Sequence, residues 1–162
     1  MKVRGCFVSN SSSSSFIIVG GQYDKDDIAA ARNVIECNRD KNYSMIVVPD
    51  DYGCSTFGWD QNEYYSFSSK LNFCCIQTRY LNEEERDRHR GMIKEVLIED
   101  CGAEDWEFDF SALDGDEGWK YYIDHQSSAQ EGMNTEMFEN KATLRRFLFS
   151  SGSSITTDND NH

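Results

Sequence analysis

The segment FVSNSSSSSFIIV, residues 7–19, places an unbroken run of hydroxyl side chains between two apolar stretches of β-type composition. Phe16–Val19 predicts a strand, and Gly20-Gly21 predicts its end. Because both flanks are apolar, we expect the run to form a tight loop anchored at each end, not the disordered linker typical of a free polar tract. Such a loop exposes backbone N–H groups and hydroxyls that can hold an anion or be modified. Its residues are Ser9, Asn10, Ser11, Ser12, Ser13, Ser14 and Ser15.

Three segments further along the chain have the capping residues and the apolar spacing of helices. The expected helices begin at Asp24, at Asn82 and at either Thr135 or Asn140. Glu85 completes a capping-box pattern with Asn82, and Gly102 predicts the end of that helix. His89 lies among charged residues and is expected to face solvent. The expected buried faces comprise Ile28, Ala31 and Ile35; Met92, Ile93, Val96 and Leu97; and Met137, Phe138, Leu144, Phe147 and Leu148.

The remaining β-like stretches predict a mostly antiparallel sheet. They are residues 43–48, 63–67, 71–78, 106–110, 119–124 and 153–157, the last as an edge strand. Ser68-Ser69-Lys70 is expected to turn a hairpin between 63–67 and 71–78, and the second of these reads as a central strand packed on both faces. We therefore predict a single α+β domain over residues 1–157, with about three helices packed on one side of the sheet, and a short polar tail over 158–162.

The net charge of −13 and the pI near 4.5 argue against direct nucleic-acid binding, which needs clustered Lys and Arg. The acidic residues are concentrated between residues 104 and 117, on the predicted hairpin of 106–110 and 119–124. They are Glu104, Asp105, Glu107, Asp109, Asp114, Asp116 and Glu117. Spaced carboxylates can present a field like that of a phosphate backbone, which predicts a partner-binding surface for a basic protein; the alternative is a solvated, solubilising face.

The N-terminus also resembles a known group. Arg4, a short gap and then F-V-S-N-S-S-S-S-S-F before an aliphatic strand is similar to the start of many small uncharacterised proteins of bacteriophages and prophages. The segments 122–127 and 147–161 are similar to that group as well, so the resemblance extends along the whole chain. It implies an origin in a phage or mobile element and no particular activity, since the group has no assigned chemistry.

Two sets of residues are weighed as chemical sites. Asp124, His125 and Ser127 offer the parts of a general base and a nucleophile, but neighbours on a strand point to opposite faces, so a structural histidine is the alternative. Asp158, Asp160 and His162 could hold zinc or manganese, but they lack a close ligand spacing. The prediction is therefore no catalytic site, no metal and no cofactor. The six cysteines form no C-x-x-C pair and are expected to be free thiols.

Taken together, the sequence predicts a phage or mobile-element protein that binds and inhibits a basic host protein or nucleoprotein complex, such as a nucleic-acid-binding defence or transcription complex. One alternative is an enzyme or small-ligand binder that uses the serine loop, the segment 124–127 and the tail. Another is a minor structural protein of the virion. No apolar run approaches the roughly 20 residues of a membrane span, and a cytoplasmic location in the host is expected. The oligomeric state is left open.

Overall fold

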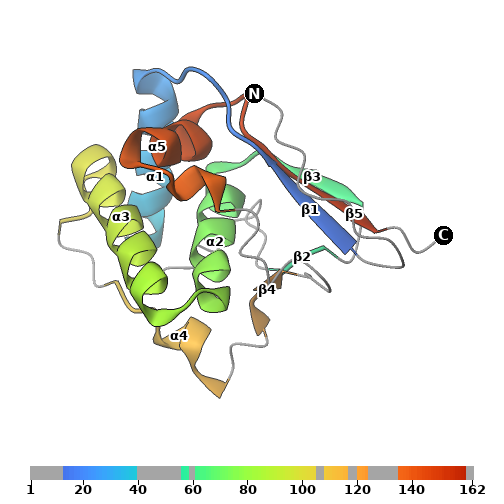
Figure 1. Cartoon of the computed structure of the whole chain (residues 1–162). Coiled ribbons are helices and arrows are strands. Elements are labelled where there is room, and N and C mark those ends of the chain that lie inside the picture. The colour runs from blue at the N-terminus through green and yellow to red at the C-terminus, as the bar shows by residue number, and fades with distance from the viewer. Residues whose placement is uncertain are drawn as a thin grey trace.

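A three-stranded sheet and four helices of nine residues or more make up the computed structural model, an α+β fold as predicted (Figure 1). The model describes residues 13–39, 56–58, 61–104, 108–116, 120–123 and 135–159. The strands are β1 (Ser13–Ile18), β2 (Thr56–Phe57), β3 (Asn62–Tyr64), β4 (Tyr122–Ile123) and β5 (Ser154–Asn159). The helices are α1 (Lys25–Arg39), α2 (Phe67–Gln77), α3 (Glu83–Cys101), α4 (Ser111–Asp114) and α5 (Lys141–Phe149), with single turns η1 (Thr78–Tyr80) and η4 (Glu136–Phe138).

The strand β5 lies in the middle of the main sheet, whose order is β1-β5-β3. Both pairings are antiparallel, and Ile155 lies opposite Ile17 on one side and Tyr64 on the other. The expectation of an edge strand near the C-terminus is therefore wrong, because strand order depends on contacts between distant parts of the chain. The strand also extends to Asn159 and so includes the first two residues of the predicted polar tail.

Helices α1 and α3 begin at the predicted caps. The Asp24 carboxylate accepts hydrogen bonds from the backbone N–H groups of Asp26 (2.8 Å) and Asp27 (3.1 Å). The Asn82 side-chain oxygen accepts from the Glu85 backbone N–H, and the Asn82 side-chain amide donates to the Glu85 carboxylate, both at 2.9 Å, an arrangement close to a capping box. Helix α3 ends at Gly102, whose φ of 65° is the left-handed conformation that glycine adopts most readily. The local capping signals thus place both helices correctly.

Helix α2 replaces the hairpin predicted for residues 63–67 and 71–78. Only Asn62–Tyr64 of that region is a strand; Ser68–Lys70 belongs to the helix instead of a turn. Ser66 caps the helix by accepting a hydrogen bond from the backbone N–H of Ser69 (3.1 Å). Every residue from Ser68 to Gln77 is buried. A segment buried on all sides lacks a polar face, so its sequence shows neither helical nor strand periodicity, and the prediction fails for that reason.

Helix α5 begins at the second of the two predicted starts. Asn140 accepts a hydrogen bond from the backbone N–H of Thr143 (2.9 Å), while residues 136–138 form the separate turn η4. The five side chains predicted to be buried in this region are all buried, from Met137 to Leu148. Together with α2 they belong to one hydrophobic core.

Within the described residues 108–110 and 120–123, the predicted acidic hairpin is not formed. Phe110 leads into the short helix α4, and β4 pairs in parallel with β2. The two-residue period of 106–110 satisfies a strand pattern, but that pattern does not determine which segment a strand will pair with. Residues 105–107 and 117–119 lie outside the described ranges, as does the predicted strand 43–48.

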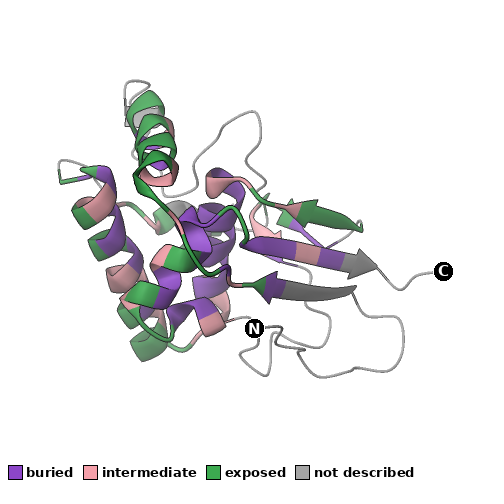
Figure 2. Cartoon of the chain, turned by 90° about the horizontal axis from the view of Figure 1, so that it is seen from above, coloured by how far each residue is buried: buried purple, intermediate pink, exposed green. Residues whose placement is uncertain are grey.

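The helices lie to one side of the three-stranded sheet in both views (Figures 1 and 2). Helix α2 contacts α1, α3 and α5 as well as β4, which places it at the centre of the helical layer. The burial colours show the same arrangement, with purple along α2 and green on the outer faces of α1 and α3 (Figure 2). None of the described helices has the length and apolar character needed to cross a bilayer.

Candidate functional site

The serine run and the C-terminal acidic segment, two of the predicted sites, meet in the main sheet. Ser13, Ser14 and Ser15 belong to strand β1, so this part of the predicted loop is extended. Ser14 lies opposite Asp158 in the pairing with β5. The other members of these sites, Ser9, Asn10, Ser11, Ser12, Asp124, His125, Ser127, Asp160 and His162, lie outside the described residues. Within the described ranges, no three His, Cys, Asp or Glu side chains gather as a metal site.

The acidic residues predicted to form one surface differ in their exposure and in their contacts. Glu104, Asp109 and Asp116 are exposed, whereas Asp105, Glu107 and Glu117 lie outside the described residues. Asp114 binds Arg90 through two hydrogen bonds of 2.6 and 2.7 Å. These bonds, more than the nearby positive charges, lower the pKa of the Asp114 carboxyl, against an opposing effect of burial. Asp114 therefore attaches α4 to α3 and is not a free member of the surface.

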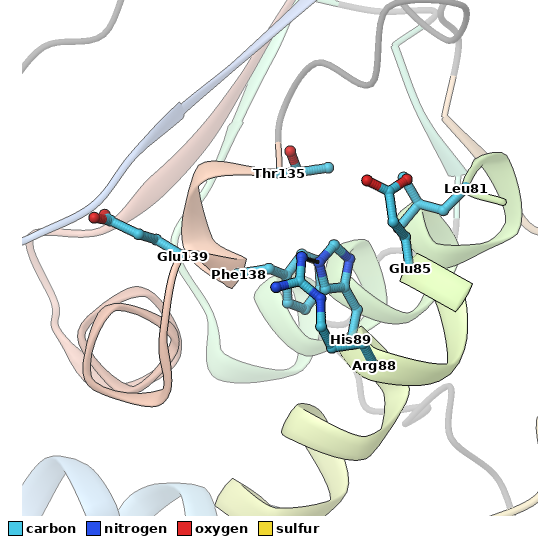
Figure 3. A pocket seen from close by; sticks show the side chains of 7 residues that line it. All are labelled: Leu81, Glu85, Arg88, His89, Thr135, Phe138 and Glu139. Atoms are coloured by element: carbon cyan, nitrogen blue, oxygen red, sulfur yellow. Dashed lines mark hydrogen bonds between the residues drawn. The ribbon is translucent and has the colours of Figure 1, made fainter. Parts of the chain in front are cut away.

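A pocket of about 240 Å³ opens between the first half of α3 and residues 135–139 (Figure 3). Leu81, Glu85, Arg88 and His89 line it from one side. Thr135, Phe138 and Glu139 line it from the other. Asn82 begins α3 and Asn140 begins α5, so the two capped helix starts position both walls.

His89 forms the floor of this pocket together with Phe138. Only 3% of its surface is exposed, and its ring stacks on the Phe138 ring at 4.2 Å with an angle of 8° between the planes. Stacking of this kind contributes on the order of 1 kcal/mol beyond the burial of area. The expectation that His89 faces solvent is therefore wrong: its ring packs on Phe138, a residue far along the chain.

The hydrogen bonds of His89 determine its tautomer. The Arg88 guanidinium lies 3.0 Å from Nε2, and a guanidinium can only donate. Nε2 must therefore accept, which places the proton of a neutral ring on Nδ1. Nδ1 is buried and has no hydrogen-bond partner among the described residues. An unpaired buried donor costs about 1–3 kcal/mol, so the position of His89 is maintained by its packing on Phe138 and not by this N–H.

The surroundings of His89 keep the ring neutral near pH 7. Burial lowers its pKa below the usual value of 6.5, and the positive charge of Arg88 lowers it further, while Glu85 acts in the opposite sense. A neutral imidazole with one free N–H can donate a hydrogen bond, but it offers no free acceptor nitrogen in this arrangement. The geometry therefore does not suit general-base catalysis by His89.

Charges of both signs border the pocket. Figure 3 shows Arg88 beside His89, with Glu85 and Thr135 on one side of the space and Glu139 on another. Glu85 and Glu139 are exposed. The pocket thus has a guanidinium and two carboxylates around an aromatic floor.

Sequence reasoning missed His89 as a site residue. Its neighbours Arg88 and Arg90 suggest an exposed, charged helix face, and the stack depends on Phe138, which no local pattern connects with it. A weak signal does exist: His89 precedes Ile93, Val96 and Leu97 on the apolar side of α3, at helical spacing from the first of them.

The buried thiols show no sign of activation. Cys74 and Cys75 lie on α2, not on the strand predicted for residues 71–78, and both are fully buried. Burial raises the pKa of both thiols well above the usual range, and it raises that of Cys101 to about 12. A thiol is nucleophilic only as the thiolate, so these three are packing residues. Cys37 is exposed, and Cys6 and Cys54 lie outside the described residues.

Comparison with protein-family models, with curated proteins and with solved structures finds no significant match to this chain.

Proposed function

We propose that this chain is an acidic interaction protein, encoded by a phage or mobile element, that binds and inhibits a basic host protein or nucleoprotein complex. The observation that carries the proposal is the net charge of −13, from 29 acidic and 16 basic residues. A field of this size attracts positively charged macromolecules and accelerates their association. The phage origin is supported by the N-terminal resemblance.

The contacts of the basic side chains support this proposal. Lys141 and Arg145 of α5 pair with Glu95, Glu99 and Asp100 at the end of α3. Arg90 is held by Asp114, and Lys70 is buried in α2. These four cations therefore make their contacts within the protein itself. Ion pairs neutralise both signs alike, so the surplus of negative charge remains on the other exposed carboxylates, such as Glu104 and Asp116.

We assign the partner contact to the exposed carboxylates that follow α3, namely Glu104, Asp109 and Asp116, together with Asp105, Glu107 and Glu117. The stretch 104–117 contains no Lys or Arg. Asp114 is left out because its charge is already neutralised by Arg90. The contact is thus a local concentration of negative charge within a generally acidic surface.

Affinity capture at two salt concentrations tests the proposal. The tagged full chain is used as bait in lysate of bacterial cells, at low salt and at about 0.5 M salt, where exposed charges more than roughly 5 Å apart are screened. We expect one basic protein or complex to be retained at low salt, to be released at high salt, and to lose its activity when the purified chain is added. Retention that is insensitive to salt, or a bound protein whose activity is unchanged, contradicts the proposal.

A further inference from the structure

Three arginine side chains gather where α4 packs near the start of α3 (Figure 1). Arg86 and Arg90 lie four residues apart on α3, so they share one face of the helix. Arg90 Nε donates to the Thr78 hydroxyl at 3.0 Å, which places the turn η1, and with it Arg79, beside the same face. Arg79, Arg86 and Arg90 are called the arginine cluster below.

The arginine cluster surrounds the carboxylate of Asp114. Hydrogen bonds from Arg90 lower the pKa of this carboxyl most, burial opposes them, and the positive charges of Arg90, Arg86 and Arg79 lower it further. All three guanidinium groups are therefore close enough to act on the same carboxylate. Three positive charges and one negative charge leave a surplus of two positive charges among these four side chains.

Arg86 is the member of the cluster that the fold leaves without a partner. Its side chain makes no hydrogen bond and no ion pair with the described part of the chain. Of its guanidinium nitrogens only Nε is buried without a partner, so the terminal nitrogens are open to solvent. Like charges four residues apart on a helix repel each other. The protein thus keeps an unneutralised guanidinium beside Arg90, with terminal N–H groups available to a ligand.

Arg90 and Arg79 are held in place by the surrounding structure. The Arg90 guanidinium lies 4.4 Å from the centre of the Phe110 ring, and only 11% of the Arg90 side chain is exposed. Arg79 donates a hydrogen bond to the backbone carbonyl of Tyr121. These two side chains provide fixed positive charge that needs no rearrangement when an anion binds, while Arg86 provides the direct hydrogen bonds.

We propose that the arginine cluster binds a phosphate group, with the terminal N–H groups of Arg86 as direct donors and the charges of Arg90 and Arg79 as support. A phosphate monoester carries a charge of about −1.5 to −2 near neutral pH, which matches the surplus of the cluster. The guanidinium fork also fits the oxygens of phosphate through paired hydrogen bonds. A monocarboxylate offers only half of that charge.

The acidic exterior of the chain opposes the approach of any anion over long distances. Binding at the cluster must therefore come from short contacts, which salt screens less than long-range repulsion. The cluster shares no residue with the surface assigned to the basic partner, so this inference does not depend on the proposed function.

A titration of the full chain, followed through the arginine Nε–H signals in NMR spectra, tests the inference. The probes are inorganic phosphate and the amide of N-acetyl-phosphoserine, which represent a free phosphate ion and a phosphorylated side chain. Acetate is the single-charge control, at the same neutral pH and ionic strength. We expect saturable shifts of the Arg86 signal with a phosphate probe at millimolar concentration, and the probe that binds more tightly identifies the source of the phosphate. Shifts of equal size with acetate, or no saturable shift with either phosphate probe, overturn the inference.

Two variants locate the binding. Arg86→Gln should weaken the binding of the tighter phosphate probe at least about tenfold, since hydrogen bonds from charged donors are among the stronger ones. The variant should keep its fold, because the Arg86 side chain makes no contact of this kind within the described structure. Arg88→Gln is the matched control: it removes the same charge from the same helix, but Arg88 lines the His89 pocket instead. Unchanged binding in Arg86→Gln, or equal weakening in both variants, contradicts the site.

Discussion

Lys70 and His89 are the two basic side chains that lie buried among the described residues. Lys70 donates to the backbone carbonyl of Ser150 at 2.9 Å, where α5 ends. The ammonium thus lies at the negative end of a helix dipole, a partial compensation for the loss of water. His89 avoids the same cost by staying neutral. In both cases burial lowers the pKa of the side chain, and a separate prediction follows for each residue.

His89 should titrate below the usual histidine pKa of 6.5 and should carry its proton on Nδ1 in the neutral form. Because the folded pKa is lowered, its contribution to stability is complete above pH 6.5 and is lost as the pH falls through the folded pKa. Nitrogen chemical shifts of the imidazole ring measure both properties. A pKa at or above 6.5, or a proton on Nε2, contradicts the described geometry.

Lys70→Met should remove a rise in stability with pH. Burial lowers the Lys70 pKa from 10.5 to about 8, so between these values the unfolded chain binds more protons and stability increases with pH. From pH 8 to 9 the gain is about 1 kcal/mol. The carbonyl of Ser150 keeps its hydrogen bond from the Ser153 N–H (3.0 Å) in the variant.

Denaturant unfolding of both proteins across pH 7–9 measures the effect as a difference between them, which cancels the ionisation of the thiols in the unfolded chain. We expect the difference in unfolding free energy to move in favour of the wild type as the pH rises. Parallel pH profiles would show that Lys70 is not buried as a charged group.

The helices and strands differ in how far local sequence predicts them. Helices α1, α3 and α5 begin at polar caps with amphipathic faces behind them, and these signals are complete within a few residues. Helix α2 has a cap at Ser66 but no polar face, so only its packing against the other helices reveals it. The central place of β5, the parallel pairing of β4 and the stack of His89 on Phe138 likewise depend on contacts between distant segments.

Gly20→Ala should destabilise the junction where β1 leaves the sheet and β5 enters it. A Cβ atom at Gly20 would lie 2.3 Å from the Ser150 hydroxyl and 2.9 Å from backbone atoms of Gly152 and Ser153. The Gly20 N–H also donates to the Ser153 hydroxyl at 2.8 Å. Backbone atoms cannot move aside cheaply, so we expect a loss of about 2 kcal/mol or more in unfolding free energy.

Gly21→Ala is the matched control for this substitution, because a Cβ atom there meets nothing within 4 Å. It should be neutral or stabilising by about 0.5 kcal/mol through a less flexible unfolded chain. Thermal or denaturant unfolding compares the two variants. Equal stability of both would show that the close approach at Gly20 does not exist.

The molecule as a whole combines internally paired cations with an acidic exterior. The ion pairs of Lys141 and Arg145 connect α5 to α3. Arg32 connects α1 to the end of α3 by donating to the backbone carbonyl of Asp100 at 2.7 Å. Exposed carboxylates lie on α1, on α3 and after it. A surplus of one sign on a small fold destabilises it by self-repulsion, and the same surplus is what a basic partner would neutralise.

Moderate salt should therefore stabilise the isolated chain. Raising NaCl from about 0.02 M to about 0.5 M screens the repulsion among exposed carboxylates, and we expect the melting temperature to increase by several degrees. The paired cations oppose this effect, but each exposed pair contributes only about 0.2–1 kcal/mol. A melting temperature that falls with salt, measured at constant pH, would show that the ion pairs outweigh the surplus charge.

The affinity of two matched triple variants for the captured partner tests the proposed contact most directly. One variant neutralises the surface after α3, with Glu104→Gln, Asp109→Asn and Asp116→Asn; the other neutralises exposed carboxylates elsewhere, with Glu36→Gln, Glu84→Gln and Asp87→Asn. Each removes three negative charges, so overall charge is matched. We predict that the first weakens binding more than about tenfold at low salt and the second has only a small effect. Equal affinities of the two variants would contradict the assignment of the partner to this surface.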